Sequence, residues 1–297
     1  MLSVHLDLCL NCQVLPKQAN SCRSYAPAPM SIFEAVVLGA VQGLTEFIPI
    51  SSSGHLVIVP ELAGWAPPGL TFDVLLHTAS LLALLVYFSG DLVDLIKGVA
   101  GGSRGSRKLA LLLVLGTIPA AVAGLVFSDY FEEQFEDAGA AALQLLITAV
   151  ILVGAEQIFR THERKTAAKG ERLRTIDDMD YKDTAIIGVA QAISIFPGIS
   201  RSGATIGAGL GLAIQRADAA RFAFLLAIPA LIGATILEVP EVGGGSLGAA
   251  PAAAGFIASL VTSYAAIWGL IRYLRTNTLY PFAAYCVVAG VVFYAAL

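Results

Sequence analysis

Six long apolar runs divide this chain of 297 residues, and they constrain its fold more than any other feature. Only 13% of the residues are charged, against about a quarter in soluble domains, and the mean hydropathy is +0.76. A helix of about 20 apolar residues is long enough to cross a membrane. The sequence therefore predicts an all-α integral membrane protein, with about six full transmembrane helices at residues 74–88 (extended at its ends), 109–127, 140–159, 222–239, 252–270 and 280–297.

Two other apolar regions are too short and too interrupted to cross a membrane as single helices. Proline, glycine and serine break the first near Pro49 and the second near Pro197. Irregular backbone at membrane depth is tolerated only where it is buried in protein or lines a cavity. We therefore expect two re-entrant broken-helix hairpins, the first from residues 32–49 and 56–63 and the second from residues 184–196 and 203–214.

The two broken regions form an internal repeat. Residues 39–54 align without a gap with residues 188–203, and seven of the sixteen aligned positions are identical. The offset of 149 positions places Arg201 at the position of Ser52. Duplicated hairpins of this kind predict that the two broken tips meet.

Loop charges indicate how the two hairpins are oriented. Basic residues gather at residues 97–108 and 160–183, and acidic residues gather in a turn at residues 129–137. By the positive-inside rule, the basic loops are cytoplasmic and the acidic turn is outside. The first hairpin then opens outward and the second inward, as in an inverted-topology repeat. We expect a single transmembrane catalytic domain over residues 30–297, with repeat halves at about 31–159 and 180–297.

Residues 1–29 have a different character, and we expect them to be a disordered N-terminal extension. They carry three of the four cysteines, but a lone CxxC from Cys9 to Cys12 is weak evidence for a metal site. Met30 stands directly before the first apolar region, so the sequence leaves open whether residues 1–29 are translated.

Arg201 is the most informative single residue of the broken regions. A charge at the centre of a membrane helix costs about 2.5 to 3.5 kcal/mol on insertion scales, so Arg201 requires an anionic partner. The planar guanidinium suits bidentate binding of phosphate, and a helix starting near Gly203 would direct free backbone amides at the same anion. The second hairpin tip therefore predicts a phosphate site.

The first hairpin supplies groups that could carry out chemistry on that phosphate. Gln42 and Glu46 lie four residues apart and project from one helix face. Either Ser52 or His55 could attack phosphorus, while Glu46 could accept a proton or hold a divalent cation such as Mg²⁺, and Arg201 could stabilise the developing charge. We expect substrate-binding roles for Gln42, Ser51, Ser53, Ser200, Ser202 and Thr205.

Three motifs resemble those of a known family. They are QGLTE from Gln42 to Glu46, SSSGH ending at His55, and PGISRSGAT from Pro197 to Thr205. They are similar to the glutamate-rich and PGxSRSxxT motifs of the bacterial undecaprenyl-diphosphatase family, which is associated with bacitracin resistance. The resemblance extends from about residue 31 to residue 297.

The resemblance implies a membrane enzyme that removes the terminal phosphate of undecaprenyl diphosphate and so recycles the lipid carrier of cell-wall synthesis. It also implies a requirement for Mg²⁺ or Ca²⁺ and places functional residues at Gln42, Glu46, Ser52, His55 and Arg201. Gln42 stands where many relatives have Glu. Because an amide cannot act as a base, we expect Glu46 to be both the base and the metal ligand. The implied location is the bacterial plasma membrane, and the outward first hairpin predicts an active site that opens to the extracytoplasmic side.

Several alternatives remain open at the level of sequence. Inverted repeats with broken helices are also typical of transporters, so a flippase of polyprenyl phosphate lipids is the rival function. The partners expected are the polyprenyl diphosphate substrate and membrane lipids; no patch typical of nucleic-acid binding is visible, and a homodimer is compatible with the sequence. His77 is interpreted as a packed, hydrogen-bonded histidine, and Glu156 as one partner of an interfacial ion pair with Arg160.

Overall fold

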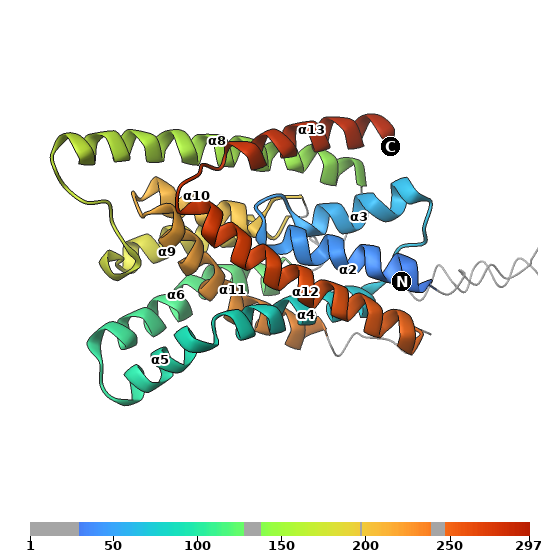
Figure 1. Ribbon diagram of the computed structural model, residues 1–297, viewed down its shortest axis with the longest axis horizontal. Coiled ribbons are helices and arrows are strands. Elements are labelled where there is room, and N and C mark those ends of the chain that lie inside the picture. Colours follow the sequence, from blue (N-terminus) through green and yellow to red (C-terminus); the bar gives the residue numbers. More distant parts are fainter. Residues whose placement is uncertain (1–29, 128–137, 197, 239–246) are drawn as a thin grey trace, which may run out of the picture.

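The computed structural model describes residues 30–127, 138–196, 198–238 and 247–297. Within these ranges the regular structure is helical (Figure 1). The elements are α2 (Ile32–Phe47), α3 (Ser52–Ala63), α4 (Leu70–Tyr87), α5 (Ser89–Ala100), α6 (Arg104–Val126), α8 (Ala138–Ala168), the 3₁₀ helix η1 (Ile176–Asp178), α9 (Tyr181–Ile193), α10 (Arg201–Gly211), α11 (Arg216–Glu238), α12 (Ala249–Leu274) and α13 (Tyr280–Ala296). The expected N-terminal extension, the acidic turn and Pro197 lie outside the described residues.

Most of the predicted transmembrane helices are confirmed. Among the described residues, five helices are long and apolar enough to cross a membrane: α4, α6, α8, α11 and α12. The sixth expected span corresponds to α13, which is apolar but has only 17 residues. The chain is therefore a multi-pass, all-α membrane protein.

Two polar segments are more helical than hydropathy predicts. The basic loop expected at residues 97–108 contains the end of α5 and the start of α6, so the connection between them is short. Helix α8 continues through Ala168, well into the polar stretch that begins at Arg160. Hydropathy falls where a helix leaves the membrane, whereas the helix itself ends only where its backbone hydrogen bonding ends.

The two broken hairpins approach each other from opposite ends of the molecule. In Figure 1, α2 and α3 occupy the right-hand half, α9 and α10 the left-hand half, and the breaks meet between them. The end of α8 lies at the upper left and the α5–α6 connection at the lower left, so both basic segments share the left-hand end of the molecule. This arrangement agrees with the expected inverted repeat.

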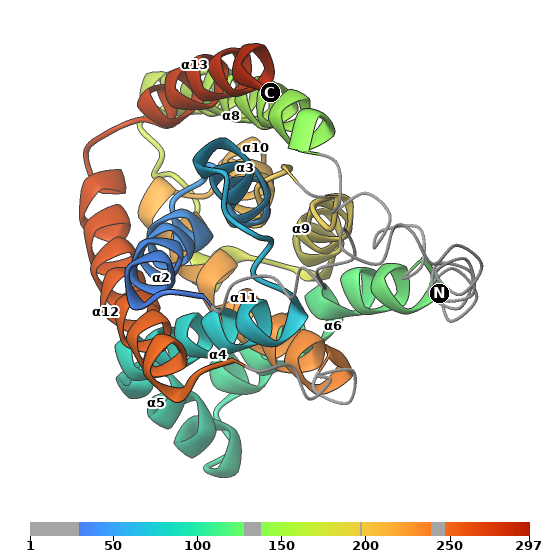
Figure 2. The ribbon, with the colours of Figure 1, turned by 90° about the vertical axis from the view of Figure 1, so that its right-hand side faces the viewer.

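Each hairpin is packed against a helix from the other half of the chain. Helix α2 packs along α12, and α9 packs along α6, as the end-on view in Figure 2 shows. A Cβ on Gly188 would lie 2.7 Å from the carbonyl oxygen of Gly116 in α6, so only glycine permits this approach. Gly39, its repeat counterpart in α2, makes the same kind of backbone contact with Gly255 of α12. The glycines at equivalent positions of the repeat thus allow helices from the two halves to pack in direct backbone contact.

Candidate active site

The first hairpin tip holds a buried carboxylate in a fixed position. Gln42 and Glu46 both lie on the buried face of α2, and the Gln42 amide Nε2 donates a hydrogen bond of 3.1 Å to Glu46 Oε2. The helix ends at Phe47 because Pro49 cannot continue it. Ser51 then adopts a positive φ of 69°, a conformation that costs a non-glycine residue about 1 to 3 kcal/mol and clusters at functional sites.

The second tip is built by serine caps and by a threonine from a neighbouring helix. Ser200 is the N-cap of α10, and its hydroxyl accepts a hydrogen bond of 3.1 Å from the Gly203 amide. Thr148 of α8 donates to the Gly198 carbonyl (2.9 Å) and accepts from the Ser200 amide (3.0 Å). These bonds fix Arg201 as the first residue of α10.

Three polar contacts between described residues join the two tips. The guanidinium of Arg201 forms an ion pair with Glu46. The Gly198 amide donates to the Ser53 hydroxyl at 3.4 Å, and the Ser202 hydroxyl donates to the Ile48 carbonyl at 3.4 Å. The meeting of the tips that the repeat predicted is therefore confirmed, and Glu46 is the anionic partner that Arg201 required.

Ser52 is the hydroxyl placed directly beside the carboxylate. Its Oγ–H donates a hydrogen bond of 2.5 Å to Glu46 Oε2. The Glu46 side chain is only 4% exposed, but Ser52 is partly exposed at the first turn of α3. A substrate can therefore reach the hydroxyl while the carboxylate stays shielded from water.

His55 lies one turn further along α3, and each of its two ring nitrogens makes a hydrogen bond. Nδ1 lies 2.6 Å from the Ser51 carbonyl oxygen, and Nε2 lies 2.7 Å from the Tyr285 hydroxyl of α13. The ring also stacks on Tyr285, with centroids 5.7 Å apart, and Phe293 contacts it edge-on. A buried imidazole with both nitrogens engaged is well suited to fixing the strained Ser51 backbone.

The remaining predicted binding residues lie at the tips, where all except the partly exposed Ser53 are buried. The Ser51 hydroxyl caps α3 and lies 3.3 Å from that of Ser53, and the Ser200 hydroxyl lies 3.1 Å from that of Ser202. The Thr205 hydroxyl donates to the Arg201 carbonyl at 2.8 Å. All six predicted residues thus lie within the two tips, and their contact with substrate stays a prediction.

Two helices start at the tips and reinforce the positive charge of Arg201. Both α3 and α10 begin there, so the site faces two helix N-termini rather than the single one expected from sequence. The first amides of a helix have no intrahelical partner, and the helix dipole favours an anion at this end. The arrangement favours a multiply charged anion such as a diphosphate.

Sequence reasoning missed three residues that complete the site. His77 of α4 is hydrogen-bonded as expected, with Nδ1 2.9 Å from the Asp73 carbonyl oxygen, but its Nε2 also lies 3.9 Å from Glu46 Oε2. Thr148 of α8 and Tyr285 of α13 are the other two. All three come from helices outside the hairpins and stand in no motif, so the sequence carried no local signal for them.

The tips also offer oxygen ligands that fit a divalent cation. The described residues contain no group of three or more His, Cys, Asp or Glu side chains that could hold a metal. However, the buried Gln42 Oε1 has no hydrogen-bond partner among these residues, and it lies on the side chain already bonded to Glu46. Mg²⁺ commonly uses one or two carboxylates together with substrate phosphates, so a carboxylate and an amide oxygen suffice for such a site.

Comparison with known proteins identifies relatives of this chain. Residues 35–292 match the family described as bacitracin resistance protein BacA. The chain is 37% identical over 279 residues to an undecaprenyl-diphosphatase of Methanosphaera stadtmanae, covering 89% of this chain and 97% of the relative. It is 41% identical over 264 residues to the protein of that name from Gloeobacter violaceus, covering 86% and 88% respectively. The protein of the same name from Geobacter sulfurreducens is 40% identical over 269 residues, covering 88% of this chain and 96% of the relative. The chain belongs to the BacA family.

Proposed function

We propose that this chain hydrolyses undecaprenyl diphosphate to undecaprenyl phosphate and inorganic phosphate, and thereby recycles the lipid carrier of cell-wall synthesis. The observation that carries this proposal is the contact of Ser52 and Arg201, from two different hairpins, with the same Glu46 carboxylate. A hydroxyl, a buried carboxylate and an arginine can supply the nucleophile, the base and the charge stabilisation for cleavage of a phosphoanhydride. The names of the relatives support the same substrate.

In the proposed mechanism, Ser52 is the nucleophile and Glu46 is the general base. The Ser52 oxygen attacks the terminal phosphorus, its proton passes to Glu46, and the bond to the bridging oxygen breaks, which releases undecaprenyl phosphate. Glu46 passes this proton to the departing phosphate and becomes a carboxylate again. Water then attacks the phosphoserine, and Glu46 accepts a proton from the water. That proton returns to Ser52 Oγ as the bond from Oγ to phosphorus breaks and inorganic phosphate leaves. Arg201 and the two helix N-termini stabilise the charge on the equatorial oxygens. His55 acts as a positioning residue because both of its nitrogens are occupied.

The second candidate function is a flippase of polyprenyl phosphate lipids. It is favoured by the two broken hairpins, which meet from opposite ends as they do in many transporters. One experiment separates the two functions: purified protein is given undecaprenyl diphosphate, in detergent with Mg²⁺ and in sealed vesicles. We expect release of inorganic phosphate in detergent. Movement of the lipid between leaflets without phosphate release would overturn the hydrolase proposal.

We also propose that Glu46 and Gln42 Oε1 hold Mg²⁺ or Ca²⁺ when substrate is bound. The cation supplies positive charge against the diphosphate. Replacing Gln42 by Glu adds a second carboxylate and is expected to lower the half-saturating Mg²⁺ concentration several-fold, whereas Gln42→Leu is expected to raise it. Titration of activity with Mg²⁺, together with calorimetric binding of Mn²⁺, measures both effects. Identical metal curves for the three proteins would exclude Gln42 as a ligand.

We propose further that the protein lies in the bacterial plasma membrane and that the active site opens to the extracytoplasmic side. The support is that the loop after α3 lies at the opposite end from the two basic segments. In a variant without native cysteines, a cysteine at Ala66 should react with a membrane-impermeant maleimide in intact cells. A cysteine at Ser103, in the α5–α6 connection, should react only after lysis. The reverse pattern would invert the proposed topology.

A further inference from the structure

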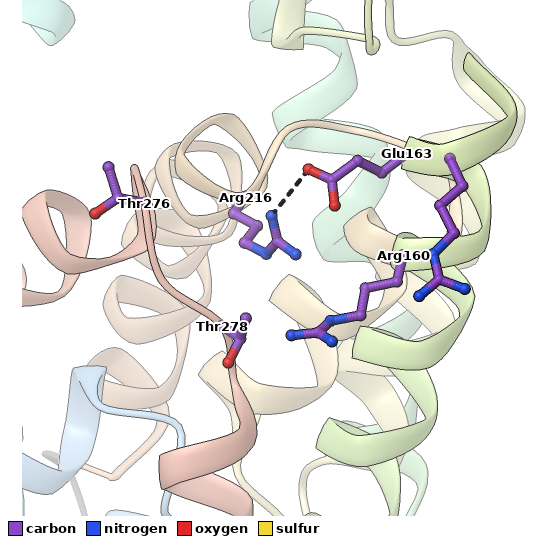
Figure 3. Close-up of a pocket in the computed structure, with 6 residues that line it drawn as sticks. Arg160, Glu163, Arg216, Thr276 and Thr278 are labelled. Atoms are coloured by element: carbon purple, nitrogen blue, oxygen red, sulfur yellow. Dashed lines mark ion pairs between the residues drawn. The ribbon is translucent and has the colours of Figure 1, made fainter. Parts of the chain in front are cut away.

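A second polar site lies at the basic end of the molecule. It is a pocket of about 310 Å³ between α8, the start of α11 and the connection from α12 to α13 (Figure 3). Helix α10 separates it from the hairpin tips, and its 11 residues span about 16 Å. The residues that line the pocket are Arg160, Glu163, Arg164, Arg216, Thr276 and Thr278.

The charges of this pocket do not cancel. Glu156, completely buried beneath it, lies 2.5 Å from Arg216 Nη2 and 3.5 Å from Arg160 Nε, and also accepts a hydrogen bond of 3.1 Å from the Leu279 amide. Glu163 lies 3.5 Å from Arg216 Nη1. Three arginines thus face two carboxylates, and Arg164 has no hydrogen bond or ion pair within the part of the chain that the structure describes. One net positive charge remains for an anion.

Two of the arginines are held rigidly. The Arg160 guanidinium lies over the Tyr280 ring, 4.9 Å from its centroid, and the Arg216 guanidinium lies 4.2 Å from that of Phe159. Figure 3 shows the Arg160 guanidinium directed toward Thr278, and the Arg216 guanidinium directed toward Glu163 and Arg160. Side chains fixed in this way lose little entropy when they bind a ligand, so the pocket is preorganised.

The position of the pocket along the helices indicates that it lies at the level of the lipid head groups. The apolar part of α8 ends near Phe159, and the pocket begins at Arg160, so it lies where the helices leave the hydrocarbon core. Aromatic side chains such as Tyr280 are typical of this depth. Basic pockets between transmembrane helices at this level bind the phosphates of lipid head groups.

We propose that this pocket binds a phosphate group, supplied by an anionic lipid head group or by free phosphate. Arg160 and Arg164 would bind the phosphate oxygens, Arg216 would add charge from beneath, and the Thr278 hydroxyl would donate a hydrogen bond. Glu163 competes with the ligand for Arg216. Because of this competition, removing the charge of Arg160 or Arg164 should weaken phosphate binding, whereas removing the charge of Glu163 should strengthen it.

The test measures binding to the purified full chain by native mass spectrometry and by thermal shift. The probes are phosphatidylglycerol, phosphatidylcholine and inorganic phosphate. One surface charge is worth about a fivefold change in affinity, so Arg164→Gln and Arg160→Gln should each weaken phosphatidylglycerol binding about fivefold. Glu163→Gln should strengthen it. Lys165→Gln, the same charge change at an exposed neighbour outside the pocket, should have little effect.

The outcomes are separable. Arg164 is exposed and has no ion-pair or hydrogen-bond partner among the described residues, so its variant should fold normally and keep its phosphatase activity. Binding of phosphatidylglycerol alone identifies a lipid site, and equal protection by inorganic phosphate identifies a free-anion site. Equal binding of phosphatidylcholine, or equal losses in Arg164→Gln and Lys165→Gln, would overturn the proposal.

Discussion

Replacing Ser52 by alanine is expected to lower kcat/KM for undecaprenyl diphosphate by about 10³-fold or more, the size of loss seen when a catalytic nucleophile is removed. The physical reason is the hydrogen bond of 2.5 Å from Ser52 to Glu46, which joins a nucleophile directly to its base. Steady-state release of inorganic phosphate measures the effect. Ser53→Ala is the matched control, because the Ser53 hydroxyl accepts from the Gly198 amide and makes no contact with Glu46 in the described structure. We expect it to cost less than about tenfold, because a single neutral hydrogen bond contributes about 0.5 to 1.5 kcal/mol.

The same series decides between the two nucleophiles that the sequence left open. His55→Gln should reduce activity by a smaller factor, because it removes support for the Ser51 backbone but leaves Ser52 beside Glu46. Quenched reactions analysed by mass spectrometry should show the phosphoryl group on Ser52. A phosphoryl adduct on His55, with an active Ser52→Ala variant, would assign the nucleophile to the histidine instead.

Breaking the Arg201–Glu46 ion pair should affect stability and activity in different ways. Arg201→Gln leaves the buried carboxylate without its cation, which typically costs about 3 to 5 kcal/mol. It should also remove about 10³-fold or more from the turnover rate, as loss of a phosphate-binding arginine does elsewhere. The double variant Glu46→Gln with Arg201→Gln removes both charges. It should recover most of the lost stability and none of the activity.

Thermal unfolding in detergent and phosphate release measure the two quantities on the same samples. Arg172→Gln is the control, because Arg172 also pairs with a carboxylate but at an exposed position. Its hydrogen bonds hold the pKa of Asp178 below the usual range, yet exposed pairs contribute little to stability. Full activity in Arg201→Gln would exclude Arg201 from the site. A double variant as unstable as Arg201→Gln would show that the lost stability does not come from the unpaired charge.

The sequence predicted the pairing of the two tips because the repeat carries that information. The offset of 149 positions identified Ser52 and Arg201 as equivalent points, and the structure places both against Glu46. Duplicated broken helices in a membrane must bury their exposed backbone, and each provides the surface that the other needs. A long-range contact could therefore be predicted from a local pattern.

The contacts that support the tips could not be predicted in the same way. Thr148, His77 and Tyr285 lie in ordinary apolar helices, where a single polar residue is compatible with many environments. Their positions depend on how α4, α8 and α13 rotate and pack around the hairpins. That packing depends on side chains along the whole length of each helix, so no short segment of sequence specifies it.

The glycine contacts between the two halves also determine when the protein can finish folding during its synthesis. While the first half alone is in the membrane, α2 lacks α12, the helix against which Gly39 packs. Glu46 at that stage also lacks Arg201, the cation that offsets its charge. The nascent first half therefore contains a membrane carboxylate without its arginine partner and an uncovered glycine face. Both are resolved only when the second half inserts, so the ribosome must nearly finish the chain before the active site can form.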